Sequence, residues 1–280
     1  MSRIVAIIVA LLFPVVVASA SEAPKALSAP SVRVVAFGLS DASEVFRKEA
    51  TKSARIVADA FAVATPPIAR WNFGGHSGAK FDDVRRTLKS VGATMKSDDI
   101  LFLILTSHGN RSGAVIASEA SNDEFLSPAR LSSILSVSGI KRRVIVVSAC
   151  YSGVFADMLA DRNTLVITAA DSWHTSFGCG DNDEWTYFGE AFFSQALPIS
   201  STLKQAFLYA EQIVYWREAW HGYAHSNPQM KGGEAILPLL PIHRGGPQDG
   251  NHFGALDAMH APEWAALRGA MNEDAVARSR

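Results

Sequence analysis

The sequence predicts an α/β fold: a three-layer sandwich in which a mostly parallel sheet carries helices on both faces. Short, wholly apolar runs such as Ile100–Leu105 recur along the chain and fit strands buried on both faces. Segments with helical spacing of apolar residues separate these runs. Of the 280 residues, 48% are hydrophobic and 19% are charged, which is enough apolar side chain for one large core.

The first predicted elements are a strand and a long helix. Residues 32–37 fit a short buried strand. Asp41 is the expected N-cap of a helix that continues to residue 64, where Pro66 and Pro67 stop it. Residues 68–73 give a weaker strand candidate, so a second strand is expected soon after the first helix.

The middle of the chain repeats this alternation. One helix face collects the apolar residues Phe81, Val84, Leu88 and Val91. The buried strand 100–105 follows. Ser127 is an expected N-cap with Pro128 at the first helical position, which predicts another helix. The apolar run 144–147 then predicts the next strand.

The C-terminal half is expected to hold a strand, two helices and a last strand, over residues 165–168, 186–197, 201–219 and 236–240. Strands that alternate with helices imply right-handed crossovers and a parallel sheet. We find no internal repeat and no second core. One domain over 32–244 is therefore expected, followed by an irregular tail, 245–280, with a short terminal helix.

The N-terminus has the pattern of a signal peptide over residues 1–20. Arg3 precedes an apolar run, 4–17, that would span only about 21 Å as a helix, against a hydrocarbon core of about 30 Å. Ala18-Ser19-Ala20 matches a signal-peptidase site. We predict cleavage after Ala20, a linker over 21–31, and an exported protein, periplasmic or secreted, with no stable membrane span. The alternative is that residues 1–20 are not cleaved and anchor the protein in the membrane.

Charge and cysteine content exclude several classes of protein. Lys plus Arg is 26 and Asp plus Glu is 27, so the net charge is −1 and no basic face for nucleic acid is expected. Two cysteines exclude a multi-cysteine zinc site. His221 and His225 lack the glutamate of the metalloprotease motif. Neither a metal nor another cofactor is expected.

A histidine and a cysteine follow two of the buried strands. His108 lies in Ser-His-Gly after strand 100–105, and Cys150 lies in Ser-Ala-Cys-Tyr-Ser-Gly after strand 144–147. Carboxyl ends of parallel strands meet at one edge of a sheet, where ligands bind. Cys150 is thus a candidate nucleophile and His108 its base. The N–H groups of Gly109 and Cys150 are candidate oxyanion donors. A buried cysteine and a turn histidine remain the alternative at this point.

These motifs resemble those of the legumain-like cysteine peptidases, the asparaginyl endopeptidases, which share the fold of caspases and gingipains. The resemblance continues in Thr-Ser-Phe-Gly-Cys at 175–179 and in Thr-Tyr-Phe-Gly-Glu at 186–190, and covers roughly residues 32–240. It implies a caspase-like sandwich and peptide or protein substrates. It also implies that Cys150 is the nucleophile and His108 the general base.

The resemblance also implies a substrate pocket, for which the matching residues are Arg47, Ser148, Thr175, Ser176 and Glu190. A guanidinium on one side and a carboxylate on the other would satisfy both ends of a carboxamide. The sequence therefore predicts cleavage after Asn or Asp. Two alternatives remain open: Arg47 and Glu190 are surface charges, or Ser148 widens the pocket and Glu190 selects Lys or Arg.

The chain departs from the family pattern at three positions. The family often has an acidic residue at the position of Ser107 and a glutamate at that of Ser148. The asparagine that orients the histidine in legumains would fall near Val45. The prediction is therefore a cysteine endopeptidase, with two alternatives: a transamidase that uses the same thioester, or a catalytically silent binding module of the same fold.

Overall fold

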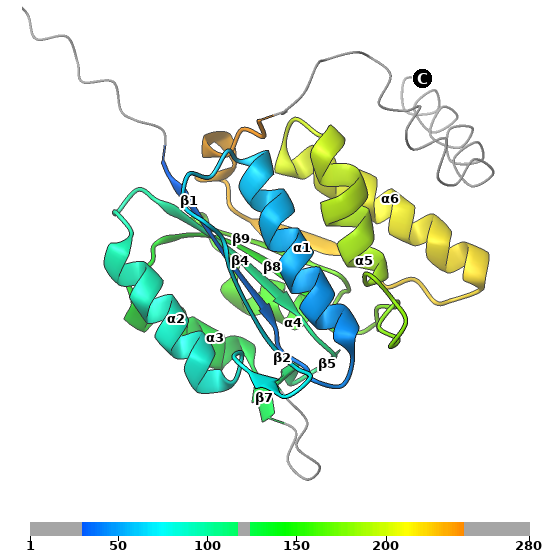
Figure 1. The fold of residues 1–280 in the computed structure, drawn as a ribbon. Helices are drawn as coiled ribbons and strands as arrows, with labels where there is room; N and C mark the ends of the chain where they lie inside the picture. The colour runs from blue at the N-terminus through cyan, green and yellow to red at the C-terminus, as the bar shows by residue number, and fades with distance from the viewer. Residues whose placement is uncertain (1–29, 117–123, 244–280) are drawn as a thin grey trace, which may run out of the picture.

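A seven-stranded sheet forms the centre of the molecule in the computed structural model, which describes residues 30–116 and 124–243 (Figure 1). Its strand order is β10-β9-β8-β4-β1-β2-β3. The strands are β1 (Val32–Gly38), β2 (Ile68–Phe73), β3 (His76–Ser77), β4 (Ile100–Thr106), β8 (Arg142–Ser148), β9 (Thr164–Thr168) and β10 (Gln229–Gly232). The five strands from β9 to β2 are parallel, and the edge strands β10 and β3 are antiparallel to their neighbours.

Helices cover both faces of this sheet, as Figure 1 shows. One face carries α1 (Glu44–Ala60), α5 (Tyr187–Gly189) with the π-helix that follows it (Glu190–Ala196), and α6 (Leu203–His221). The other face carries α2 (Phe81–Thr94), α3 (Pro128–Ser138) and α4 (Gly153–Leu159). The predicted three-layer α/β architecture is confirmed.

Alternation of side chains along the strands builds the two core layers. In β1, Val34 and Ala36 pack into the layer under α1, whereas Val35 and Phe37 pack into the layer under α2 and α3. All seven residues of β4 are buried, as expected for a central parallel strand covered on both faces.

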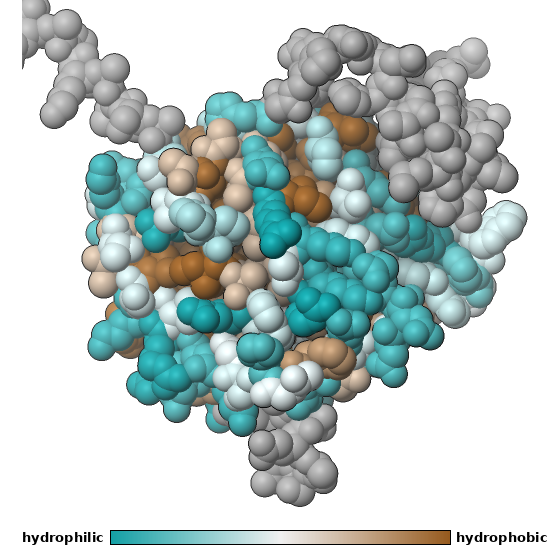
Figure 2. All heavy atoms as spheres, in the orientation of Figure 1, coloured by the Kyte–Doolittle hydropathy of each residue, from teal (hydrophilic) through white to brown (hydrophobic). Residues whose placement is uncertain are grey.

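Most of the face seen in Figure 2 is polar, with hydrophobic side chains exposed only in small separate groups.

A second, three-stranded sheet was not predicted. It consists of β5 (Gly109–Asn110), β6 (Gly113–Ile116) and β7 (Glu124–Leu126), paired antiparallel. These strands are too short to show a period of two. The sheet begins directly after His108 and therefore fixes the backbone on one side of the candidate site.

The predicted bounds of the first helix were wrong at both ends. Its N-cap is Ser43, whose side chain accepts a hydrogen bond from Val45 N, and not Asp41. The helix ends at Ala60, before the predicted residue 64, because Ala62 adopts a left-handed conformation with φ 47°.

The last predicted strand, 236–240, was also wrong. Leu237–Leu239 is a 3₁₀ helix containing Pro238, which has no N–H to contribute to a ladder. The final strand is instead β10, which pairs antiparallel with β9. The predicted helix 186–197 contains α5 and a π-helix, and a 3₁₀ turn, Leu197–Ile199, follows.

Several predictions concern residues outside the described ranges. These are the signal peptide 1–20, nearly all of the linker 21–31, and the tail 245–280 with its helix. Within residues 30–116 and 124–243, no helix has the length and apolar character needed to cross a membrane.

Candidate active site

The candidate catalytic residues follow adjacent parallel strands. β4 and β8 pair along their whole length, from Ile100 opposite Arg142 to Thr106 opposite Ser148. His108 and Cys150 each lie two residues beyond that last pair, and Ser107 N donates to Ser148 O at 3.1 Å to extend the ladder. The predicted adjacency of the two strands is confirmed, and both residues lie at the carboxyl edge of the sheet.

Within residues 30–116 and 124–243, the Cys150 thiol makes its hydrogen bonds with Ser176 alone. Cys150 Sγ lies 3.4 Å from Ser176 O, to which it can donate, and accepts from Ser176 N at 3.3 Å and Ser176 Oγ at 3.7 Å. The next residue, Tyr151, has φ 56°, a left-handed conformation that is uncommon for a bulky side chain. The thiol is thus presented on a sharp turn, half-buried against the predicted substrate segment.

The His108 imidazole is oriented by an aromatic contact. The Phe46 ring meets it edge-on, with centroids 4.9 Å apart and planes at 78°. Burial holds the pKa of His108 below its ordinary value of 6.5, because desolvation disfavours the imidazolium. Val45, which stands near the family's asparagine position, is a fully buried apolar residue. An unprotonated imidazole is the form that a general base requires.

We expect the acid limb of kcat/KM to have its midpoint below pH 6.5. The neutral imidazole is the active form, so activity is complete above the His108 pKa and is lost as the pH falls through that lowered value. Phe46→Leu admits water to the ring and should move the midpoint up towards 6.5. Rates of Cys150 alkylation between pH 4 and 8 give the same information without a substrate. A midpoint above 6.5 in the wild type contradicts this assignment.

Gly109 fits closely against the backbone beside the thiol. A Cβ at this position would lie 2.4 Å from Cys150 O and 3.1 Å from Ala149 Cβ, so only glycine allows this approach. Val115 N donates to His108 O at 2.9 Å, which makes 108 and 115 the hydrogen-bonded pair of the small sheet. Gly109 opposite Ala114 is then a non-hydrogen-bonded pair, so the Gly109 N–H points away from β6. It is thus available to an oxyanion.

The two charged residues of the predicted pocket each have another partner. Arg47 forms an ion pair with Glu44 one turn earlier on α1. Glu190, the first residue of the π-helix, accepts from Arg217 Nη1 at 2.6 Å. Arg217 also lies over the Tyr187 ring, 4.9 Å from its centroid. No ion pair between Arg47 and Glu190 occurs among the described residues, and Arg217 was missed because it comes from α6.

The three hydroxyl residues of the predicted pocket differ in exposure. Ser176 contacts the thiol, as described above, and Thr175 beside it is exposed. Ser148 is only 1% exposed and shares a hydrogen bond with Thr186 Oγ1 at 2.9 Å. Ser148 therefore lies beneath the surface of the site. A substrate can contact it directly only if the neighbouring side chains move aside.

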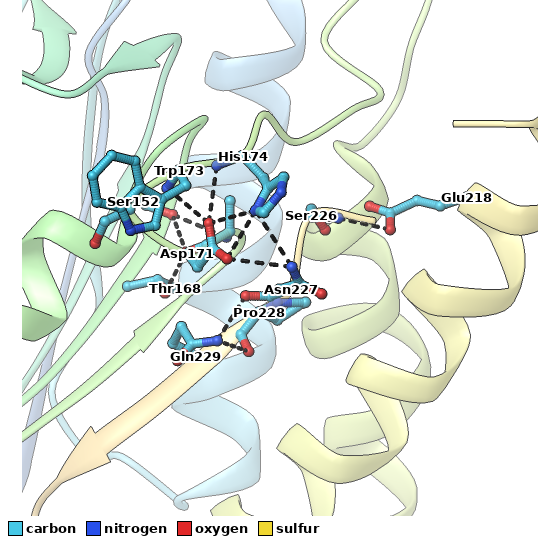
Figure 3. A network of polar contacts seen from close by, with 12 residues as sticks. Ser152, Thr168, Asp171, Trp173, His174, Glu218, Ser226, Asn227, Pro228 and Gln229 are labelled. Atoms are coloured by element: carbon cyan, nitrogen blue, oxygen red, sulfur yellow. Dashed lines mark hydrogen bonds and ion pairs between the residues drawn. The ribbon is translucent and has the colours of Figure 1, made fainter. Parts of the chain in front are cut away.

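A polar network centred on Asp171 fixes the turn behind the thiol (Figure 3). Asp171 Oδ1 accepts from Trp173 N at 2.7 Å and from His174 N at 2.9 Å, and the carboxylate also binds His174 Nδ1. Asn227 Nδ2 donates to Asp171 Oδ2 at 3.3 Å. His174 O in turn accepts from Tyr151 N at 2.9 Å, so the network holds the residue after the nucleophile. It joins two loops far apart in sequence, so no local sequence pattern indicates it.

Metal binding has no support in the described part of the chain. No three His, Cys, Asp or Glu side chains lie close enough together there to hold an ion. His221 Nδ1 bonds Arg217 O at 2.8 Å, whereas His225 stacks on Tyr215 with centroids 4.0 Å apart. Cys150 and Cys179 are free thiols.

A thiol and an imidazole on adjacent strand ends, with a backbone N–H beside them, define the active-site type of a cysteine peptidase in an α/β sandwich. The comparison with family models agrees: residues 81–240 match the model described as the Peptidase C13 family. The chain belongs to this family, so the resemblance to legumain-like peptidases is confirmed.

Solved structures with a similar fold include caspase-1 from Spodoptera frugiperda. That match has a TM-score of 0.49 and 9% sequence identity, and it covers 73% of this chain and 87% of the caspase chain. No curated protein matched the sequence.

Proposed function

We propose that the protein is an exported cysteine endopeptidase that cleaves peptide bonds through Cys150 and His108. The observation that supports this most strongly is the ladder between β4 and β8, which presents both residues at one sheet edge. The bonds between Ser176 and the thiol add to it, because they bring the predicted substrate segment against the nucleophile.

The reaction begins when Cys150 Sγ attacks the carbonyl carbon of the substrate and His108 takes the thiol proton. The N–H groups of Gly109 and Cys150 stabilise the negative charge that develops on the carbonyl oxygen. His108 then gives its proton to the leaving amine as the C–N bond breaks, which leaves a thioester on Cys150. Water attacks the thioester with His108 as base, and the acid product and free thiol result.

A thiol-reactive peptidyl probe tests this function. The probe should label Cys150 in the mature protein, Cys150→Ala should remove the label, and Cys179→Ala should retain it. Absence of labelling with correctly folded protein would favour the silent binding module. Mass spectrometry of products formed with an added amine separates the two chemistries: a new amide on the acyl fragment indicates transamidation, and the free acid indicates hydrolysis.

The proposed specificity is for Asn or Asp before the scissile bond. Arg47 follows Phe46, which contacts the His108 ring, and Glu190 begins the π-helix that packs against α1. A guanidinium has five donors, so the pair with Glu44 leaves others for a substrate carbonyl. Glu190 keeps acceptor positions beside its bond to Arg217 in the same way.

We expect the preference for Asn to collapse in both Arg47→Ala and Glu190→Ala, with kcat/KM falling at least about tenfold, because one charge-assisted hydrogen bond is worth about 1.5–3 kcal/mol. Peptides that differ only at the residue before the scissile bond provide the measurement. Arg55→Ala, an exposed position on the same helix, is the matched control. A preference for Lys or Arg would overturn the assignment, and no preference at all would make both residues ordinary surface charges.

The proposal that the protein is exported rests on the sequence pattern of residues 1–20. The mature protein should begin at Ser21 and accumulate outside the cytoplasm, which N-terminal sequencing of the fractionated protein measures. An intact Met1 on membrane-associated protein would favour the uncleaved anchor.

A further inference from the structure

A fully buried carboxyl group lies among hydroxyl groups beneath the candidate site. Glu49, on the inner side of α1, is 0% exposed. Its Oε2 accepts a hydrogen bond from Thr186 N at 2.9 Å, whereas Oε1 is buried without a partner. The hydroxyls of Thr106, Ser148 and Thr186 lie near this carboxyl group and favour its charged form, although Thr106 Oγ1 makes no hydrogen bond to it in this structure. We call these four residues the Glu49 cluster.

The Glu49 cluster joins the elements that carry the candidate catalytic residues. Thr106 ends β4 two residues before His108, and Ser148 ends β8 two residues before Cys150. These two hydroxyl residues face each other in the ladder. Glu49 links both strand ends to α1, so a change in its position would reach both sides of the site.

The cluster also holds the start of α5. Thr186 Oγ1 lies 2.9 Å from Ser148 Oγ and accepts from Gly189 N at 2.9 Å, which caps the helix. A Cβ on Gly189 would lie 2.1 Å from Glu49 Oε2, so the carboxyl group fills the space that a larger residue would need. Glu190 follows directly, and its position therefore depends on the same contact.

No cation of the described ranges pairs with Glu49. Among the described residues it has no ion pair: its helix neighbour Lys48 bonds Glu184 at 2.7 Å, and Arg47 pairs with Glu44. Hydroxyl and backbone groups face Glu49 from β4, β8 and α5. From the loop before α5, the titratable group that interacts with it is Cys179, itself uncharged because burial raises its pKa. Glu190, beside Gly189, is paired with Arg217.

Burial without a cation favours a proton on Glu49. Glu49 Oε1 and Thr106 Oγ1 are both buried without a hydrogen-bond partner, and a bond between them could form with either group as the donor. A carboxylic acid has one O–H donor, which can be directed at a neighbouring hydroxyl oxygen. Burial also raises the pKa of Glu49, because desolvation outweighs the hydrogen bonds that favour the charged form.

We propose that Glu49 is a positioning residue that acts in its neutral, protonated form, holding the strand ends under His108 and Cys150 together with α1 and α5. Its catalytic consequence rests on the proposed peptidase function, whereas its protonation and its structural role do not. Glutamine is the nearest neutral replacement, with the same shape and an amide donor in place of the acid O–H.

The raised pKa fixes the direction of the pH dependence. The folded-state value lies above the unfolded value of about 4.5, so the stability that neutral Glu49 provides is complete below pH 4.5. That contribution is lost as the pH rises through the folded-state pKa. Glu184 has the opposite behaviour, because Lys48 and Lys52 lower its pKa to about 2. Glu184 is exposed, so its contribution to stability is modest, and that contribution is lost only in acid.

Thermal unfolding of the wild type, Glu49→Gln and the control Glu184→Gln between pH 5 and 9 tests the neutral form. The melting temperature of the wild type should fall relative to that of Glu49→Gln by about 3 °C or more as the pH rises. Glu184→Gln should follow the wild type over this range. Parallel curves for the wild type and Glu49→Gln, or a Glu49→Gln variant destabilised equally at every pH, would overturn the inference.

The alkylation rate of Cys150 tests the positioning role. Glu49→Gln should react within about twofold of the wild type at pH 6 and lose any alkaline decline in peptide kcat. Glu49→Ala, if folded, should react at least about tenfold more slowly. Equal rates in all three folded proteins, or an alkaline decline unchanged in Glu49→Gln, would overturn positioning. Reactive Cys150 without peptide cleavage in any variant would instead refute the proposed function and leave the thermal result standing.

Discussion

We expect Cys150→Ala and His108→Ala each to abolish peptide hydrolysis while the protein stays folded. Cys150→Ala removes the atom that forms the thioester, so no acyl-enzyme can arise. His108→Ala removes the group that takes the thiol proton and protonates the leaving amine. General-base help alone contributes about 10²–10⁴ in rate, and both variants should therefore fall at least that far.

Stability should change little, because both side chains lie on turns beyond the strands and are only half-buried. His108→Ala loses the edge-on contact with Phe46, worth about 0.5–1.5 kcal/mol, and Cys150→Ala loses the weak bonds of the thiol with Ser176. Circular dichroism and thermal unfolding check the fold, and turnover of a quenched peptide checks the activity. Cys179→Ala is the control, which should keep its activity. A His108→Ala enzyme with wild-type kcat/KM would show that another group is the base.

The second large effect is expected for Gly109→Ala. The added Cβ would come within 2.4 Å of Cys150 O, a backbone atom, so one of the two catalytic turns must move. Loss of one oxyanion donor costs about 10²–10³ in kcat in a serine protease that uses the same kind of acyl transfer. We expect a loss of kcat in that range, with the cost to folding limited to about 1–3 kcal/mol of overpacking.

The matched control is Gly78→Ala, where the Cβ would meet Trp71 O at 3.4 Å, an ordinary contact. That variant should keep wild-type kcat. The measurement is kcat and KM for one peptide in both variants, together with their melting temperatures. Unchanged kcat in a folded Gly109→Ala enzyme would mean that the oxyanion is stabilised elsewhere and that the close approach to Cys150 is only a packing feature.

The sheet could be predicted because its central strands are built around short apolar runs. The run 100–105 has no polar residue and became β4, buried along its whole length. The small sheet after His108 could not be predicted, since two- to four-residue strands carry no period. The π-helix at 190–196 was predicted as a continuous helix, because local residue preferences do not distinguish the two kinds of turn.

The catalytic pair was accessible from sequence for the same reason: each residue directly follows a recognisable strand. The partners of Arg47 and Glu190 were not accessible, because Arg217 reaches Glu190 from a separate helix. Glu49 did leave a trace in the sequence. It lies four residues after Val45 and four before Ser53, on the stripe that α1 buries, so a charged residue there was the unusual observation.

The register between β4 and β8 has a consequence for how the chain can vary. His108 and Cys150 each lie two positions beyond the last residue pair of the two strands, Thr106 and Ser148. Main-chain hydrogen bonds between neighbouring strands therefore set the separation of the two catalytic residues. It does not depend on the length of the chain that connects them. Insertions or deletions in that connection, away from α3 and the small sheet, should leave the pair intact. Engineers could therefore graft new recognition segments there without rebuilding the reaction centre.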